Sequence, residues 1–253
     1  MRNIIDLSGR QILITGASSG IGAATAITCS QIGAKVILVA RREDKLQSVL
    51  NLLEGSNHKY YCFDLTQVIE IESFIKEMIS ECGPVDGFVH SAGISCRRPI
   101  RQTKPEIMKN VLDINLCSFI EIVRCITKRD SYNAGLSIVG VSSVSSLMGN
   151  KAKVAYSVSK AGIDAAIRCI AKELADVGIR ANSVCPGIIQ TDFYEQLKKV
   201  TGDSEDTIAG IERQYLGLGK PEDVANMIAF LLSDASRLIT GASIGIDGGM
   251  LSS

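Results

Sequence analysis

The sequence predicts an α/β protein built on one doubly wound, parallel, seven-stranded sheet with helices on both faces. Short apolar runs rich in β-branched residues alternate with longer helical patterns along the whole chain. The short runs are continuously apolar, which is typical of strands buried on both faces. No low-complexity linker or internal repeat divides the 253 residues, so we expect a single domain over 1–253.

The first half of the chain contains four of the expected strands. Each is a short run of apolar, β-branched or aromatic residues: Gln11–Thr15, Lys35–Ala40, Lys59–Phe63 and Val85–His90. Longer segments between them predict helices at Gly20–Ile32, Glu43–Leu53 and Val68–Glu81. Glu43 and Asp44 suit the first turn of a helix, where the helix dipole favours negative charge.

The second half continues the alternation. Pro105–Asn115 is expected to open a pair of long helices, followed by a strand at Leu136–Ser142 and a long helix at Val154–Asp176. The remaining elements are expected as strand Ile179–Cys185, helix Pro221–Leu232 and strand Ala242–Asp247. The polar stretch 190–219 has no clear strand, and we expect it to form a lid over the substrate. A pair of surface helices is the alternative.

The composition narrows the class of protein. The chain has 27 basic and 27 acidic residues, so no net charge favours nucleic acid or an anionic membrane. No apolar stretch approaches the roughly 20 residues of a membrane span. Met1–Arg10 lacks the pattern of a signal peptide, and we expect a cytoplasmic protein.

The cysteines and histidines do not predict a metal site. None of the eight cysteines forms a C-x-x-C pair, and the two histidines, His58 and His90, lie far apart. We therefore expect no bound metal, and free thiols in a reducing compartment.

A glycine-rich turn follows the first strand. In Thr15–Gly22, Gly16 permits a sharp turn, Gly20 lets the backbone approach a pyrophosphate, and Gly22 lets the helix pack close to the sheet. The helix that starts here offers free N–H groups and a positive dipole end to phosphates. The turn therefore predicts a dinucleotide site of the Rossmann type, lined also by Ser18, Ser19 and Ile21.

Tyr156 and Lys160 are four residues apart on a predicted helix and so lie on one face. An ammonium beside a phenol stabilises the phenolate, so we expect the pKa of Tyr156 to fall from its reference near ~10 toward neutrality. Such a tyrosine could exchange a proton in carbonyl/alcohol chemistry. The spacing alone also fits an aromatic ring packed under a lysine stem.

Together, the turn and the Tyr156/Lys160 pair resemble the short-chain dehydrogenase/reductase family. Ser143 lies thirteen positions before Tyr156, as the catalytic serine of that family does, and Asn115 matches its proton-relay asparagine. By this resemblance, Tyr156 is the general acid or base, Lys160 tunes it and binds the nicotinamide ribose, and Ser143 contacts the substrate oxygen.

The resemblance also assigns residues to the cofactor and covers essentially the whole chain. It implies that further cofactor contacts come from Asp64, Leu65, Ser91, Ala92, Gly93, Pro186, Gly187, Ile189 and Thr191. The ending Ile246–Met250 is similar to the closing strand and turn of the family. The chain departs from the family's Asn-Asn-Ala-Gly at His90–Gly93, where we expect His90 to be packed or partly exposed; a catalytic acid is the alternative.

Two arginines after the second strand predict NADP(H) as the cofactor. A carboxylate at this point would bind the ribose 2′-hydroxyl of NAD, whereas an arginine attracts a 2′-phosphate. We expect Arg41 to be the leading contact and Arg42 a secondary one.

The substrate is less defined than the chemistry. The chain looks most like the 3-oxoacyl-[acyl-carrier-protein] reductase branch, which implies fatty acid biosynthesis and an acidic carrier protein as partner. Lys128 and Arg129 fall where that branch has a docking pair, but Val177 replaces a second docking arginine. Arg97, Arg98, Arg101 and Lys104 either flank the site mouth and attract an anionic substrate, or form a solvated loop.

Other readings remain open. The same motifs occur in reductases of sugars, polyols, steroids and other small ketones, and a non-enzymatic alternative is a cofactor-binding sensor or scaffold. The resemblance also implies a homotetramer. Ile163, Ala166, Ile167 and Ile170 have a spacing that would serve either a core or a subunit interface.

Overall fold

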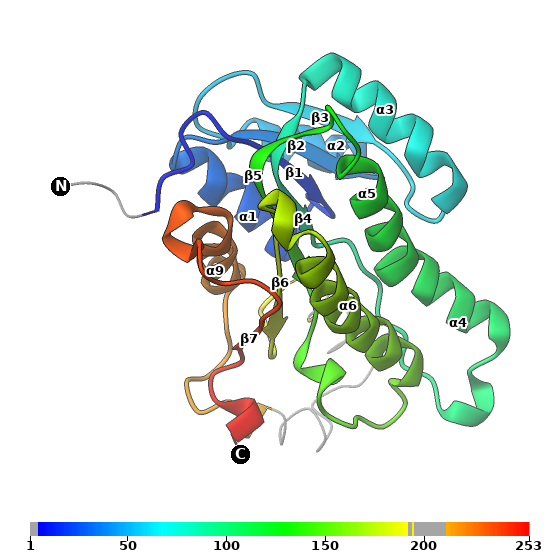
Figure 1. Ribbon diagram of the computed structural model, residues 1–253. Helices are drawn as coiled ribbons and strands as arrows, with labels where there is room; N and C mark the ends of the chain where they lie inside the picture. Colours follow the sequence, from blue (N-terminus) through cyan, green and yellow to red (C-terminus); the bar gives the residue numbers. More distant parts are fainter. Residues whose placement is uncertain (1–4, 192–193, 195–210, 253) are drawn as a thin grey trace.

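The computed structural model describes residues 5–191, 194 and 211–252 (Figure 1). Its centre is a parallel sheet of seven strands in the order β3-β2-β1-β4-β5-β6-β7. The strands are β1 (Gln11–Thr15), β2 (Lys35–Ala40), β3 (Lys59–Cys62), β4 (Val85–His90), β5 (Tyr132–Val141), β6 (Arg180–Pro186) and β7 (Ser243–Ile246). The predicted doubly wound sheet is confirmed.

Helices cover both faces of the sheet (Figure 1). One face packs against α1 (Gly20–Gln31), α2 (Glu43–Leu50) and α9 (Pro221–Leu232). The other face packs against α3 (Ile71–Cys82), α5 (Ser118–Ile126) and α6 (Val154–Glu173), and α4 (Pro105–Leu112) contacts α6. Ile163 and Ile167 of α6 are fully buried in the core, so their apolar spacing serves the core.

The expected pair of long helices is one helical run with an irregular middle. Between α4 and α5 the residues Asp113–Cys117 form a π-helical turn, in which the Ser118 N–H donates to the Asp113 carbonyl. A π turn inserts one extra residue into a helix and often marks a functional site. This turn places Asn115 inside the molecule.

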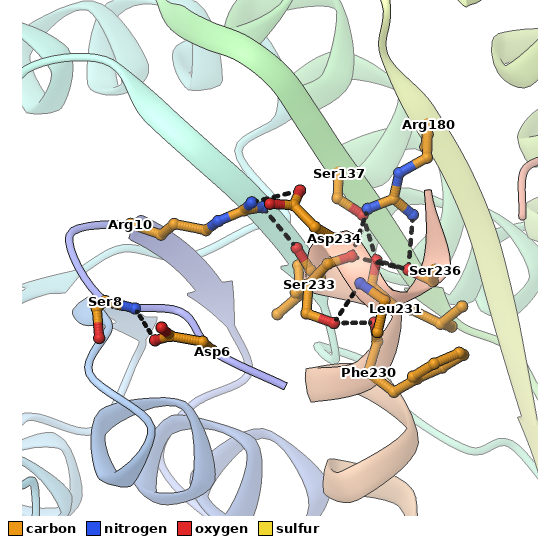
Figure 2. A network of polar contacts seen from close by, with 12 residues as sticks. Asp6, Ser8, Arg10, Ser137, Arg180, Phe230, Leu231, Ser233, Asp234 and Ser236 are labelled. Atoms are coloured by element: carbon orange, nitrogen blue, oxygen red, sulfur yellow. Dashed lines mark hydrogen bonds and ion pairs between the residues drawn. The ribbon is translucent and has the colours of Figure 1, made fainter. Parts of the chain in front are cut away.

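A polar network around the end of α9 lies at the amino ends of the strands, opposite their carboxyl ends (Figure 2). Arg10 donates to the Leu232 carbonyl at 2.9 Å and pairs with Asp234 at 2.6 Å. Arg180 donates to the Ser233 carbonyl at 3.2 Å. Two cations therefore satisfy carbonyls at the negative end of the helix dipole.

The lid expected at 190–219 lies largely outside the described residues. Of this stretch the structure describes 190–191, 194 and 211–219. Its last residue, Gly219, forms an isolated parallel bridge with Ile189, the residue just before the stretch. Among the described residues, no helix combines the length and apolar character needed to cross a bilayer.

Candidate active site

A cavity of about 330 Å³ opens at the carboxyl ends of the strands. This is the edge of a doubly wound sheet where ligands usually bind. Nearly all predicted site residues line it: Gly16, Ser18, Ser19, Gly20, Ile21, Arg41, Arg42, Asp64, Leu65, Ser91, Ala92, Gly93, Ser143, Tyr156, Lys160, Pro186, Gly187, Ile189 and Thr191. Their individual roles remain predictions.

In the glycine turn, neighbouring backbone atoms occupy the space that a Cβ on Gly16 or Gly22 would need. Gly16 has φ +69°, and a Cβ added to it would lie 2.6 Å from the Ala92 nitrogen. A Cβ on Gly22 would lie 2.3 Å from the Gly16 carbonyl oxygen. Gly22 does not line the cavity but packs α1 under the turn. The α1 N-terminus, whose Ser19 N-cap makes no side-chain cap hydrogen bond, faces the cavity and can hold an anionic pyrophosphate.

The two arginines after β2 differ in position. Arg42 donates to the Ser18 hydroxyl at 3.1 Å and the Ser19 hydroxyl at 3.0 Å. Both arginines are exposed, and Arg42 is the one hydrogen-bonded to the glycine turn. Both arginines line the cavity, so the order of Arg41 as leading and Arg42 as secondary contact stays a prediction, and the hydrogen bonds of Arg42 make it the other candidate for a phosphate on the adenine ribose.

Ser143 and Tyr156 meet in the cavity. Ser143, 8% exposed, follows β5, and its hydroxyl oxygen accepts from the Ser145 N–H at 3.1 Å. Tyr156 is in the first turn of α6 and is hydrogen-bonded to the Ser143 side chain. A substrate carbonyl beside both hydroxyls would receive two hydrogen bonds.

The expected fall in the pKa of Tyr156 is wrong for this structure. Burial raises the pKa of Tyr156, and the hydrogen bond with Ser143 opposes this rise only in part. The Lys160 ammonium lies 5.7 Å from the tyrosine ring centroid and donates to the Val141 carbonyl at 2.7 Å. Burial of the phenol thus sets the direction of the shift.

Lys160 is itself perturbed. It is 4% exposed, and burial lowers its pKa to about 8, while the charges of Asp164 and Cys185 act in the opposite direction. An amine with this pKa holds a proton at neutral pH and can release it readily.

Asn115 does not line the cavity but binds the backbone of Ile94, which does. Its side-chain oxygen accepts from the Ile94 N–H at 2.8 Å, and its Nδ2 donates to the Ile94 carbonyl and the Ser159 hydroxyl, both at 3.0 Å. A Cβ on Gly93 would lie 3.4 Å from both the Asn115 oxygen and the Lys160 Nζ. Asn115 and Lys160 therefore both approach Gly93 from the interior, and the proton relay between them stays a prediction.

His90 is packed, as expected. It is fully buried, with Nδ1 2.9 Å from the Thr15 hydroxyl. Burial, followed by the charge of Lys160, lowers its pKa to about 3. A histidine that is neutral at working pH is a poor proton donor, so the structure does not favour the catalytic-acid alternative.

Sequence reasoning missed part of the lining. The missed residues flank predicted ones at strand ends or in the π turn: Ala40, Phe63, Ile94, Ile114, Val141 and Ser142. Ser142 and Val141 end β5 next to Ser143, so adjacency to a motif was the available signal. No signal in the sequence indicated Ile114, because its position in the cavity wall depends on the π turn.

The described part of the chain contains no cluster of three His, Cys, Asp or Glu residues that could hold a metal ion. All eight cysteines are free thiols.

Comparison with known proteins identifies relatives along nearly the whole chain. The profile of a family described as enoyl-(acyl carrier protein) reductase matches residues 16–251. A 3-oxoacyl-[acyl-carrier-protein] reductase from Thermotoga maritima is 36% identical over 97% of this chain and 99% of its own length. The enzyme of that name from Escherichia coli is 34% identical over the same shares.

Solved structures agree in fold. A putative short-chain alcohol dehydrogenase from Sinorhizobium meliloti superposes with a TM-score of 0.91 at 30% identity, covering 99% of this chain and 100% of that one. A putative 2-deoxy-D-gluconate 3-dehydrogenase from Agrobacterium tumefaciens with bound NADP superposes with a TM-score of 0.87 at 28% identity, covering 100% of both chains.

Proposed function

The chain belongs to the short-chain dehydrogenase/reductase family, and from this premise we propose that it transfers hydride between NADP(H) and a ketone or secondary alcohol. Members of this family are oxidoreductases that act on CH–OH groups with a nicotinamide cofactor. The single observation behind the proposal is that Ser143, Tyr156 and Lys160 share one cavity with the glycine turn.

The residues present fit a nicotinamide dinucleotide. Gly16, Gly20 and Ile21 line the cavity at the start of α1, so its free N–H groups can bind a pyrophosphate. Asp64 and Leu65 would contact the adenine, Ser91–Gly93 the adenine ribose, and Pro186, Gly187, Ile189 and Thr191 the nicotinamide carboxamide. When bound, the nicotinamide supplies or accepts the hydride.

The side chains provide the proton. Because burial raises the pKa of Tyr156, the phenol is protonated at neutral pH and suits the role of general acid in reduction. Ser143 would donate a second hydrogen bond to the oxygen on which negative charge develops. Lys160, which holds a proton at neutral pH, would return a proton to Tyr156 after each reduction.

Arg42 supports NADP(H) over NAD(H). Its guanidinium lies on the Ser18 and Ser19 hydroxyls, beside the place of the adenine ribose. A guanidinium and two hydroxyls form a suitable site for a 2′-phosphate. The structural neighbour from Agrobacterium tumefaciens described above also holds bound NADP.

For the substrate we propose a 3-oxoacyl-[acyl-carrier-protein]-like thioester, because the curated relatives described above bear that name. Arg98, Arg101 and Lys104 are exposed, and the Arg98 N–H donates to the Ala152 carbonyl at 2.7 Å, which ties their loop to the segment before Tyr156. A basic rim at this place suits an acidic carrier.

The expected docking pair gives weaker support. Lys128 pairs with Glu72, which also binds Arg124, so Lys128 is engaged within the protein, while Arg129 is exposed. The second candidate is a reductase of a sugar acid or other small ketone, which the name of the Agrobacterium tumefaciens neighbour, a putative 2-deoxy-D-gluconate 3-dehydrogenase, favours. We also propose a homotetramer; Ile120 and Val158, each 46% exposed, offer apolar surface on α5 and α6.

The test is NADPH oxidation with a panel of 3-oxoacyl thioesters, keto sugar acids and simple ketones, with Tyr156→Phe as control. Turnover of a carrier-bound thioester supports the first candidate, and turnover of keto sugar acids alone supports the second. Wild type as inert as Tyr156→Phe across the panel would favour a sensor or scaffold.

The carrier is tested separately by Arg98→Glu and Arg101→Glu, with Lys35→Glu as the matched control. Lys35 is equally exposed but begins β2, at the opposite edge of the sheet. We expect the first two variants to raise KM for the carrier substrate, with an effect that weakens in high salt. An unchanged KM would count against carrier docking at this rim.

A further inference from the structure

Gln214 is a buried glutamine that lies outside every motif recognised in the sequence. Its side chain is 3% exposed, and its amide binds main chain rather than other side chains. The Oε1 accepts from the Ile188 N–H at 2.8 Å, and the Nε2 donates to the Ile188 carbonyl at 3.1 Å and the Gly217 carbonyl at 2.6 Å. Three of its hydrogen-bonding positions are thus used on backbone.

Ile188 lies between two residues of the cavity wall, Gly187 and Ile189. Since Gln214 binds both the N–H and the C=O of Ile188, it fixes the two peptide planes that join Ile188 to these neighbours. Gly219 adds a second donor to the Ile188 carbonyl at 3.1 Å. The orientation of this stretch of wall therefore depends on a residue 26 positions away.

Two glycines from different segments make room for Gln214. A Cβ on Gly187 would lie 2.5 Å from the Gln214 Oε1, and a Cβ on Gly248 would lie 2.6 Å from its Cγ. Gly187 follows β6, and Gly248 follows β7. Residues from three separate parts of the chain thus surround the Gln214 side chain, and this indicates that the surrounding backbone is shaped to hold its amide in one position.

We propose that Gln214 is a positioning residue for the nicotinamide end of the cavity. It does not line the cavity; it acts through Ile188 on the turn Pro186–Ile189, where the nicotinamide carboxamide would bind. The inference rests on the proposed function, because it takes the cofactor to be a nicotinamide dinucleotide. It also joins residues 211–217, at the end of the expected lid, to the cofactor site.

The test compares Gln214→Met with the control Gln11→Met. Methionine fills nearly the same volume but cannot replace the hydrogen bonds. Gln11 is also a glutamine whose Nε2 binds backbone carbonyls, of Cys82, Gly83 and Pro84 at 3.0 to 3.1 Å, but it begins β1 at the opposite edge of the sheet. Gln214→Glu serves as a second variant, because it keeps the acceptor and loses both donors.

Three measurements are made on each full-length protein. Calorimetry gives Kd for NADP⁺ and for adenosine 2′,5′-bisphosphate, which contains the adenine half alone, and hydrogen exchange of the Ile188 amide is followed without cofactor. For Gln214→Met we expect Kd for NADP⁺ to rise about tenfold and Kd for the fragment to stay within about twofold. Ile188 should exchange faster, and Gln11→Met should change none of the three.

The outcomes separate the two claims. If wild type binds no nicotinamide dinucleotide, the proposed function fails and this inference fails with it. If wild type binds NADP⁺ and both Gln214 variants bind it equally well, or lose the fragment in the same proportion, the positioning role alone is wrong. If Gln214→Met does not fold, the same comparison with Gln214→Glu decides.

Discussion

Replacing Arg42 with alanine should change cofactor preference without changing stability. Arg42 is exposed and donates to two hydroxyls at 3.0 and 3.1 Å, and exposed polar contacts of this kind contribute only about 0–1 kcal/mol to folding. A 2′-phosphate bound by the same guanidinium would lose a charge-assisted interaction worth roughly 1.5–3 kcal/mol. Affinity for NADPH should therefore fall by a factor of about 10 to 150.

The assay is fluorescence or calorimetric titration of wild type, Arg42→Ala and Arg41→Ala with NADPH and NADH. NADH lacks the 2′-phosphate, so its affinity should be nearly unchanged in both variants. Arg41→Ala, which removes the arginine without contacts to the turn, should have the smaller effect on NADPH. An equal loss for both cofactors, or a larger loss in Arg41→Ala, would show that the phosphate is not bound as the Arg42 geometry implies.

Three further predictions concern chemistry, packing and stability. Burial lowers the pKa of Lys160 to about 8 and raises that of Tyr156, so Lys160 is the first of the two to lose its proton as pH rises. Reduction should therefore slow as pH rises through about 8. A pH–kcat profile that stays flat to well above this value would contradict the role of Lys160 as proton source. Gly22→Ala puts a Cβ 2.3 Å from a backbone oxygen and should lower the free energy of unfolding by about 1–3 kcal/mol, as measured in urea; Gly149→Ala, with open space around it, should be close to neutral. Arg180→Met should lower the free energy of unfolding by roughly 1–3 kcal/mol, because the Ser233 carbonyl loses this donor. Affinity for the cofactor should stay unchanged, and a loss of affinity would contradict a purely structural role for Arg180 at the end of α9.

The sequence predicted the sheet because periodicity reports burial. All seven strands were found where apolar runs predicted them, but β5 begins at Tyr132 instead of Leu136, because its first residues are partly exposed and do not look apolar. The helix from Val154 ends at Glu173, three residues early, and the short turn that follows ends at Gly178 in a left-handed conformation. Boundaries of this kind depend on local caps more than on hydrophobic pattern.

The site shows where sequence reasoning ends. Motifs located Ser143, Tyr156 and Lys160 in the cavity lining, but they carry no information about desolvation, so the predicted direction of the Tyr156 pKa shift was wrong. Arg41 and Arg42 are neighbours after β2, and the sequence pattern does not report that Arg42 is the one hydrogen-bonded to Ser18 and Ser19. The π turn around Asn115 and the contacts of Gln214 with Ile188 depend on distant backbone, and a local pattern cannot report them.

The network at the end of α9 has a consequence for how the protein is made. Arg10, which enters β1, binds Leu232 and Asp234, which are separated from it by more than 220 residues, and α9 packs against α1 (Figures 1 and 2). On the ribosome, the first strands and α1 emerge long before α9 exists to cover them. Their apolar face stays open until α9 has been synthesised, so this side of the core is completed late. A nascent chain truncated before Pro221 should therefore depend on chaperones that bind exposed apolar surface.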